Sequence, residues 1–324
     1  MTQINRVLEK WLPLLTPAAV MAGVLLSNWL QAFVYLVPFI FAFITFSSSL
    51  GIHPRDLSKV ALHPFPLLLG LIIIQLVMPS LAFLTGHALF SADPETIHGL
   101  VLAFAIPTGV VSLMWVTIYQ GNRSLTLAII LVNTLLSPIL VPFILRIFIG
   151  TAVEMDTVGM MSSLFWMIVL PSIAGILLHY ALKDRTKLVG AKLAPLSKLC
   201  LLTVIALNSS VAAPYFKALD ARLFAIIFVV FVLATVGYLI GMGAARLFKL
   251  EPGSAIGLMF NCGMRNIGAG AALAVLYFPP ATMLPVIAGT LFQQILAALF
   301  GKVSHSQRIK KEQMIAAKIA NQKD

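Results

Sequence analysis

Charged side chains are scarce in this sequence. Only 10% of its 324 residues are charged and 60% are hydrophobic, whereas about a quarter of the residues are charged in a soluble domain. No hydrophilic stretch is long enough to form a separate soluble domain. The first apolar run has no small-residue cleavage site after it, so we expect this run to remain as a helix. The sequence therefore predicts a polytopic membrane protein.

Cysteine is rare, and acid is missing from every apolar segment. Cys200 and Cys262 both lie in apolar segments, with no disulfide framework and no metal-ligand spacing. All eleven acidic residues fall in joints or tails. The sequence contains no activated nucleophile, metal constellation or intramembrane acid–base pair, so we do not expect an enzyme or a cofactor. A channel is also disfavoured, because there is no ring of like charges and no filter motif.

Ten apolar segments can be drawn along the chain, each bounded by polar, proline or glycine residues. They are roughly 12–30, 33–50, 65–86, 97–119, 124–149, 157–182, 193–213, 221–247, 253–277 and 279–301.

The positive charges follow the order of the joints. Of the 22 lysines and arginines, 18 fall at the N-terminus, at alternate joints and in the C-terminal tail. Arg146, Lys217 and Arg222 fall on the other side, and Arg265 lies inside a segment. This asymmetry predicts that both termini are cytoplasmic and supports an even number of spans. It also explains the net charge of +11 as a topology signal, so we do not expect the protein to bind nucleic acid.

Arg265 is the ionisable residue that stands out. At 1.5 Å of rise per residue it lies roughly 18 Å from either end of segment 253–277, too far to reach the surface. An ionised side chain at that depth is costly and usually functional. In one interpretation it is structural and donates to half-helix carbonyls or to nearby amides. In the other it also attracts an anion, because its planar fork suits carboxylates and phosphates.

Two of the segments are interrupted at matching places. The fourth is broken at Pro107-Thr108-Gly109, and the ninth carries glycines around Gly263 and Gly268. Broken helices at equivalent positions of two halves are typical of transporters with internal repeats. Five spans in each half would invert the second half, and the broken helices would cross near the bilayer midplane. We expect repeats over 1–150 and 151–303 and a basic cytoplasmic tail over 304–324, with a short helix at 307–321.

Three short motifs carry a family resemblance: Gly121-Asn122, Ser137-Pro138 and the Gly-Met-x-Asn run at Gly263–Asn266. The chain resembles the bile acid:sodium symporter family, as a bacterial-type member, over nearly its whole length. The resemblance implies an all-α membrane fold of ten transmembrane helices in two inverted five-helix repeats. Helices 1, 2, 6 and 7 would form a panel domain and the others a core domain. Helices 4 and 9 would be broken and cross, with substrate bound nearby between core and panel.

The family's sodium-site positions are altered in this chain. By the resemblance they correspond to Gln75, Ser112, Leu113, Thr126, Ile130, Asn261 and Arg265. Asn261 and Arg265 stand where sodium-coupled members have glutamate and glutamine. Sodium needs oxygen ligands and usually some negative charge, and a guanidinium would repel it. Sodium binding at these positions is therefore possible but disfavoured, and the fixed positive charge of Arg265 would take the place of the ion. We expect no other metal site.

The candidate substrate-binding residues cluster around the two interruptions. They are Arg265, Asn266, Thr108, Ser112, Asn261, Gln293 and Gln294. The amides of Asn266, Gln293 and Gln294 could equally join helices. Ser47–Ser49 and Asn208–Ser210 could face the pocket from the panel side or cap helix ends.

These features predict a secondary transporter of small organic anions, carboxylates in particular, that works by alternating access without the family's sodium sites. One alternative is a sodium-coupled symporter of organic anions or bile acids. A second is a transporter-like binding or sensor protein without turnover. We expect an integral protein of the bacterial inner membrane whose partners are the substrate and the lipid bilayer.

Overall fold

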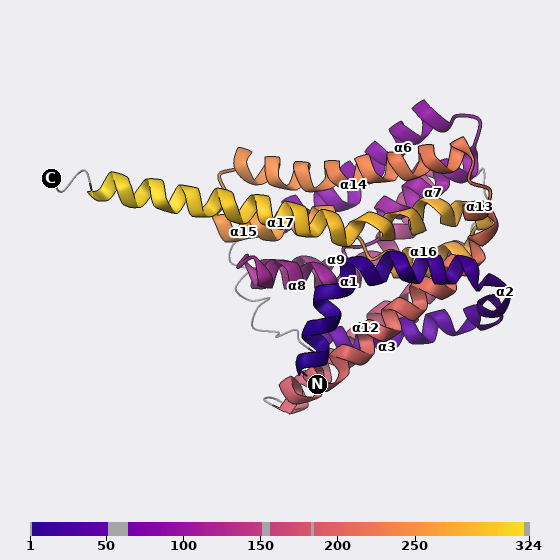
Figure 1. Cartoon of the computed structure of the whole chain (residues 1–324), viewed down its shortest axis with the longest axis horizontal. Coiled ribbons are helices and arrows are strands. Elements are labelled where there is room, and N and C mark those ends of the chain that lie inside the picture. Colours follow the sequence, from indigo (N-terminus) through magenta and orange to yellow (C-terminus); the bar gives the residue numbers. More distant parts are fainter. Residues whose placement is uncertain (1, 51–63, 151–155, 183–184, 321–324) are drawn as a thin grey trace.

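The protein is a bundle of helices (Figure 1). The computed structural model describes residues 2–50, 64–150, 156–182 and 185–320, and no strand occurs among them.

The helices of the first half follow in the order that the apolar segments predict. They are α1 (Thr2–Leu25), α2 (Ser27–Leu30), the 3-10 turn η1 (Gln31–Leu36), α3 (Val37–Ser49), α5 (Phe65–Ile72), the π-helical turn η2 (Ile73–Val77), α6 (Met78–Phe90), α7 (Pro94–Ala105), α8 (Val111–Ile118) and α9 (Arg123–Ile149).

The second half of the chain is also built from helices and short helical turns. Its elements are α10 (Thr157–Leu164), the π-helical turn η3 (Phe165–Val169), α11 (Leu170–Leu182), α12 (Arg185–Val211), α13 (Ala213–Lys217), α14 (Ala221–Leu247), α15 (Pro252–Gly263), α16 (Ile267–Tyr277), the 3-10 turn η4 (Pro280–Thr282) and α17 (Met283–Ala320).

Within the described part of the chain, 7 helical stretches are long and apolar enough to cross a membrane. They are Ser27–Ser49, Phe65–Phe90, Arg123–Ile149, Thr157–Leu182, Leu188–Val211, Ala221–Leu247 and Pro280–Ser304. The apolar helix at Lys10–Leu25 is shorter. The pairs α7/α8 and α15/α16 are missing from this set because each is interrupted in the middle.

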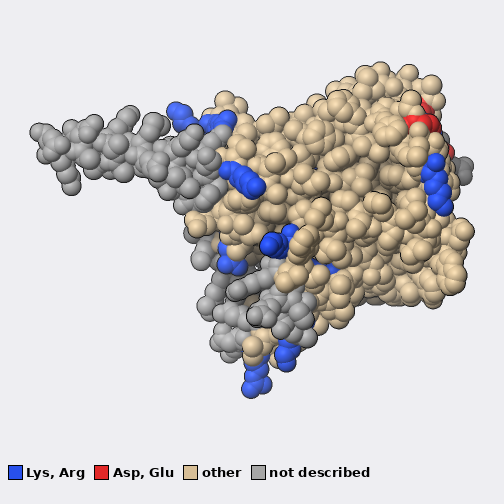
Figure 2. All heavy atoms as spheres, viewed as in Figure 1, with Lys and Arg blue, Asp and Glu red and all other residues tan. Residues whose placement is uncertain are grey.

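Aspartate or asparagine side chains cap the starts of several helices. Asp93, Asn122, Asp156 and Asp220 each accept a backbone N–H three residues ahead, at the starts of α7, α9, α10 and α14. Such caps satisfy donors that a helix start leaves open. Figure 2 shows most of the visible Lys and Arg towards the end of the molecule from which α17 projects, and the visible Asp and Glu at the opposite end beside a few further basic side chains.

The interruption between α7 and α8 follows from Pro107. The residue before a proline is pushed out of the helical region, and Ile106 is extended, with φ −60° and ψ 149°. In the second interruption, between α15 and α16, Met264 is extended with φ −105° and ψ 140°. The Asn266 N–H donates to the Pro107 carbonyl at 2.9 Å, so the two interruptions lie directly against each other.

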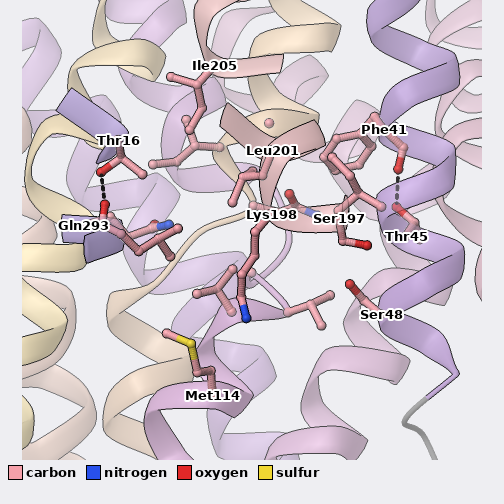
Figure 3. Close-up of a pocket in the computed structure, with 18 of the residues that line it drawn as sticks. Thr16, Phe41, Thr45, Ser48, Met114, Ser197, Lys198, Leu201, Ile205 and Gln293 are labelled. Atoms are coloured by element: carbon pink, nitrogen blue, oxygen red, sulfur yellow. Dashed lines mark hydrogen bonds between the residues drawn. The ribbon is translucent and has the colours of Figure 1, made fainter. Parts of the chain in front are cut away.

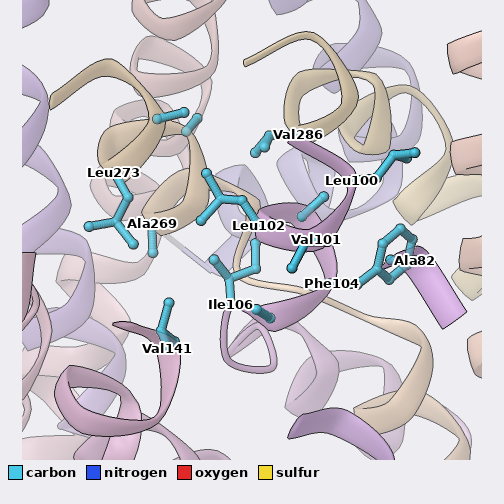
Figure 4. Close-up of a cluster of buried hydrophobic side chains, with 14 of the residues drawn as sticks. Ala82, Leu100, Val101, Leu102, Phe104, Ile106, Val141, Ala269, Leu273 and Val286 are labelled. Atoms are coloured by element: carbon cyan, nitrogen blue, oxygen red, sulfur yellow. The ribbon is translucent and has the colours of Figure 1, made fainter. Parts of the chain in front are cut away.

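Helix α7 lies at the centre of the bundle. Its residues from Thr96 to Ala105 are all buried, as expected for a helix that is apolar on every side. Figure 4 shows Leu100, Leu102 and Ile106 packed beside Ala269 of α16 and Val286 of α17. The core therefore fixes both interruptions against the start of α17.

The C-terminal helix is longer than the sequence pattern predicts. Helix α17 runs for 38 residues without a break, so the proposed boundary at 303/304 lies inside it, and the tail helix is its continuation to Ala320. Asn321, the last residue of the expected tail helix, lies outside the described residues. Figure 1 shows α17 extending beyond the rest of the bundle.

Candidate functional site

A cavity of about 240 Å³ lies beside the crossing of the two interrupted helices (Figure 3). Helices α1, α3 and α12 form one wall, and the two interruptions, α8 and α17 form the other. Its lining residues are Leu12, Thr16, Phe41, Ile44, Thr45, Ser47, Ser48, Gly109, Val110, Val111, Met114, Gly190, Ala194, Ser197, Lys198, Leu201, Ile205, Arg265, Asn266, Ile267, Gly268, Thr290, Gln293 and Gln294.

Arg265 reaches this cavity from the second interruption and is only 5% exposed. Its Nη1 donates long hydrogen bonds to the Asn261 carbonyl at 3.5 Å and the Met264 carbonyl at 3.4 Å. Its Cζ lies 5.9 Å from the centroid of the Phe104 ring. Nε and Nη2 are buried and have no hydrogen-bond partner among the described residues. The guanidinium is therefore anchored on backbone carbonyls at one edge, as the structural interpretation predicts, while its other two nitrogens are buried without a partner among the described residues.

Behind the cavity wall, Asn261 joins the two interruptions. Its Oδ1 accepts from the hydroxyls of Thr108 at 3.4 Å and Ser112 at 3.3 Å, and its Nδ2 donates to the Gly257 carbonyl at 2.8 Å. Thr108 also donates to the Met264 carbonyl at 3.2 Å. All three side chains are buried and are absent from the cavity lining. In this conformation the structure thus brings them together but not onto the cavity surface.

The other three candidates do line the cavity. Gln293 accepts the Arg265 backbone N–H at 2.9 Å, and Gln294 accepts the indole N–H of Trp115 at 2.9 Å. Asn266 lines the cavity and ties the two interruptions together through its backbone. These amides both join helices and face the cavity.

The remaining sodium-site positions are occupied by protein contacts. Gln75 donates to Asn133 across η2 and α9, although Gln75 Oε1 and Asn133 Nδ2 have no partner among the described residues. Thr126 donates to the Asn122 carbonyl at 3.0 Å. Ile130 is buried in the interior, and Leu113 packs against Leu127 and Leu131. The described residues contain no group of three or more His, Cys, Asp or Glu that could hold a metal.

Sequence reasoning missed Lys198 as a cavity residue. Its charge fits the topology pattern of the joints, yet Figure 3 shows its side chain extending from α12 into the cavity toward Met114. Its ammonium also donates to the Asn5 side chain. The available signal was its place five residues inside the apolar segment 193–213, which is deeper than a joint between helices.

Hydroxyl groups on the opposite wall were only partly anticipated. Ser47 and Ser48 line the cavity, so the pocket alternative holds for those two residues. Ser49 instead donates to the Thr45 carbonyl at 2.8 Å. Thr16, Thr45 and Ser197 also line the cavity from this wall, and Thr290 lines it from α17.

A second, much smaller space of about 10 Å³ continues from the cavity along α12. It shares Ile205, Ile267, Gly268 and Thr290 with the main cavity. Asn208 Nδ2 and Oδ1 and Ser209 Oγ are buried near it without hydrogen-bond partners among the described residues. A buried polar group without a hydrogen-bond partner is costly, so this small space is a polar spot in an otherwise apolar region.

Long apolar helices around a largely apolar cavity, with two interrupted helices meeting at its wall, are the architecture of an integral membrane transporter. The chain belongs to the sodium bile acid symporter family, whose model matches residues 38–219. It is 48% identical to "Uncharacterized protein YbaS" of Bacillus subtilis over 90% of this chain and 95% of that protein.

More distant relatives carry transport descriptions. "Uncharacterized sodium-dependent transporter YocS" of Bacillus subtilis is 25% identical over 89% of this chain and 87% of its own length. "Probable sodium/metabolite cotransporter BASS2, chloroplastic" of rice is 24% identical over 83% of this chain and 65% of its own length.

Proposed function

We propose that this transporter moves a small organic anion, a carboxylate, through the cavity beside Arg265. The observation that carries the proposal is the partly engaged, buried guanidinium at the cavity wall. No Asp or Glu occurs among the residues that line the cavity, so the natural counter-charge is an anionic ligand. Asn266, Gln293 and Gln294 add polar contacts beside it, while Thr108, Ser112 and Asn261 would approach a ligand in another conformation.

The size of the cavity supports a small substrate. Its volume of about 240 Å³ is below the range of about 300–1,000 Å³ that is usual for pockets that hold drug-sized ligands. Most of the lining is aliphatic, aromatic or hydroxyl-bearing. A compact acid with a hydrocarbon body fits this lining better than a rigid steroid.

The ten-span arrangement of the family supplies a mechanism for the proposal. The cavity wall formed by α1, α3 and α12 corresponds to the panel domain, and the wall with both interruptions corresponds to the core. In this proposal the termini and the start of α12 lie at the cytoplasmic face of the bacterial inner membrane, as expected from the positive-inside distribution. The present cavity, which includes Gly190 and Lys198 of α12, would then face inward. The nearly closed space at Asn208 would be part of the outward path.

The residues present do not fit the family's sodium sites. The carbonyls of Asn261 and Met264, which are oxygens a cation could use, already accept from Arg265 Nη1. A cation beside this guanidinium would be repelled by several kcal/mol even at an effective dielectric of about 20. In this proposal the arginine holds the crossing together without sodium.

Sodium-coupled uptake is the second candidate, because the relative from Bacillus subtilis is described as sodium-dependent. The two candidates are separated by uptake of radiolabelled carboxylates into proteoliposomes with a sodium gradient and with choline in its place. We expect uptake that is specific for carboxylates and changes by less than about twofold when sodium is replaced, far less than the tenfold that 1.4 kcal/mol of coupling would give. Strict sodium dependence would establish the second candidate. Binding of a carboxylate without any uptake would indicate the sensor alternative.

A further inference from the structure

Asn208 and Ser209 of α12 bring unused hydrogen-bonding groups to the small space that adjoins the main cavity. Asn208 is 2% exposed and Ser209 is fully buried. Neither the two polar atoms of the Asn208 amide nor the Ser209 hydroxyl has a hydrogen-bond partner among the described residues. Buried polar groups in folded proteins are nearly always paired, so we expect these atoms to meet a partner that comes from outside the helices.

Other hydroxyl groups on the same helix are satisfied within it. Thr203 Oγ1 donates to the Leu199 carbonyl at 3.0 Å, and Ser210 Oγ donates to the Leu207 carbonyl at 2.6 Å. A bond to a carbonyl three or four residues back is a common arrangement for Ser and Thr inside a helix. Ser209 departs from this arrangement, and it is one of the residues that line the small space.

The small space has room for one oxygen-sized atom and opens off the main cavity. Its volume of about 10 Å³ is close to that of a single water-sized sphere. Ile205, Ile267, Gly268 and Thr290 line both spaces, and Ile205 is labelled in Figure 3. Ile267 and Gly268 follow closely after Arg265 in the chain. A ligand beside Arg265 can therefore extend one small group into this space.

The lining suits a neutral group that both donates and accepts hydrogen bonds. It includes no Asp, Glu, Lys, Arg or His among the described residues, so a charged group would lose its hydration there without gaining an opposite charge. The Asn208 amide offers a donor and an acceptor, and the Ser209 hydroxyl can serve as either. Thr290 Oγ1 donates to the Ile287 carbonyl at 2.6 Å and can still accept. A hydroxyl group combines the matching donor and acceptor in one oxygen atom.

We propose that Asn208 and Ser209 form a subsite for a hydroxyl group of the substrate, so that the transported anion is a hydroxy acid. This inference rests on the proposed function, because Arg265 would take the carboxylate of the same molecule. An acid without the hydroxyl leaves these groups unpaired or paired only with water. A site that pairs with a substrate hydroxyl discriminates against the analogue that lacks it.

The test measures binding to the purified full-length protein by titration calorimetry, with pentanoate and the isomeric hydroxypentanoates as ligands. We expect at least one hydroxypentanoate to bind about tenfold more tightly than pentanoate, because it pairs groups that are otherwise unpaired. Asn208→Leu should abolish this preference by weakening the hydroxy acid, with the affinity for pentanoate changed by less than about twofold. Ser209→Ala removes one partner and should reduce the preference in part.

Thermal unfolding of the same variants separates binding from folding. Asn208→Leu exchanges an unpaired buried amide for an apolar side chain of similar size, so it should unfold at the same temperature as the unaltered protein or at a higher one. A variant that keeps its stability and loses the hydroxyl preference is the result expected for a binding group. Lower stability with an unchanged preference would show a structural role for Asn208 and would overturn the inference.

Thr203→Val is the matched control. Thr203 lies on the same helix, is exposed, stands outside the lining of both spaces and has its hydroxyl bonded within the helix. This variant should keep the preference unchanged. Equal binding of pentanoate and every hydroxypentanoate would overturn the inference and would indicate a water site only.

Arg265→Gln distinguishes failure of this inference from failure of the proposed function. Binding of these acids that depends on Arg265 but shows no hydroxyl preference would refute only the subsite. A hydroxyl preference that requires Asn208 while Arg265→Gln binds as tightly as the unaltered protein would refute only the role of Arg265 in the proposed function. If none of the acids binds, both are wrong.

Discussion

The two interruptions meet at one place but differ in chemistry. The one between α7 and α8 is built from Pro107, Thr108 and Gly109 and carries no charge. The one between α15 and α16 carries Arg265 and Asn266, and both of these residues line the cavity. The first interruption contributes Gly109 to the lining, while its Thr108 hydroxyl donates a hydrogen bond to the Met264 carbonyl in the second interruption.

This difference indicates a division of labour. The uncharged interruption supplies shape and hydrogen bonds that hold the other one in place. The charged interruption presents the group that a ligand would meet. Mutations at the charged interruption should therefore change transport most, and mutations at the uncharged one should change stability first.

The largest effect is expected at Arg265. Arg265→Gln removes the charge and leaves an amide that cannot replace a bidentate contact, so carboxylate uptake should fall by about a hundredfold, the equivalent of about 3 kcal/mol. Arg265→Lys keeps the charge without the planar fork and should lie in between. Initial rates of uptake into proteoliposomes measure both variants.

Arg146→Gln is the control for this experiment. Arg146 is exposed in the last turn of α9, so its loss should change uptake by less than about twofold, as is usual for surface substitutions. Near-normal uptake by Arg265→Gln would contradict the assignment of the charged interruption to substrate binding.

A smaller effect on transport, and a clear one on stability, is expected at Gly109. A Cβ at this position would lie 2.8 Å from the Arg265 carbonyl oxygen, so Gly109→Ala must push the interruptions apart. We expect a loss of about 1–3 kcal/mol of unfolding free energy, typical of overpacking, together with reduced uptake. Thermal unfolding in detergent and uptake assays measure the two effects.

Gly243→Ala on α14 provides the comparison, because a Cβ there meets nothing within 4 Å. It should be neutral or stabilising by up to about 1 kcal/mol, the helix propensity difference between the two residues. Equal behaviour of the two alanine variants would mean that the close approach at Gly109 is unimportant.

The smallest effect is expected from Thr108→Val, which keeps the shape of the side chain and removes its hydroxyl. The lost bonds to Met264 and Asn261 should cost about 0.5–1.5 kcal/mol, with uptake reduced by less than about threefold. Thermal unfolding and uptake are again the measurements. A loss of uptake as large as that of Arg265→Gln would show that Thr108 contacts the substrate and that the division between the interruptions is incorrect.

Much of the fold could be predicted from the sequence because the signals are local. Apolar runs set helices, Pro107 sets an interruption, and the asymmetry of lysine and arginine predicts a topology. The positions of the ends were less predictable: α17 continues to Ala320 because no proline or glycine stops it after Gly301. The family resemblance that the motifs carry agrees with the match over residues 38–219.

The site was only partly accessible to the same reasoning. Arg265 could be recognised because an arginine deep in an apolar segment needs an explanation in any fold. Lys198 could not be placed, because a lysine near the start of the expected apolar segment 193–213 is compatible with the surface as well as with a cavity. Asn261 could be placed near Thr108 and Ser112, but the sequence could not say that these side chains are bonded to each other behind the lining.

The sequence by itself determined that this chain is an all-helical membrane protein with one deeply placed arginine and no acid at its depth, because hydropathy, charge and helix breakers act over a few residues. Only the tertiary structure decided that α12 brings Lys198 to the cavity opposite Arg265, and that one edge of the guanidinium is anchored on half-helix carbonyls while the other is not. Both features depend on the packing of helices that are far apart in the chain, and a local sequence pattern cannot predict such packing.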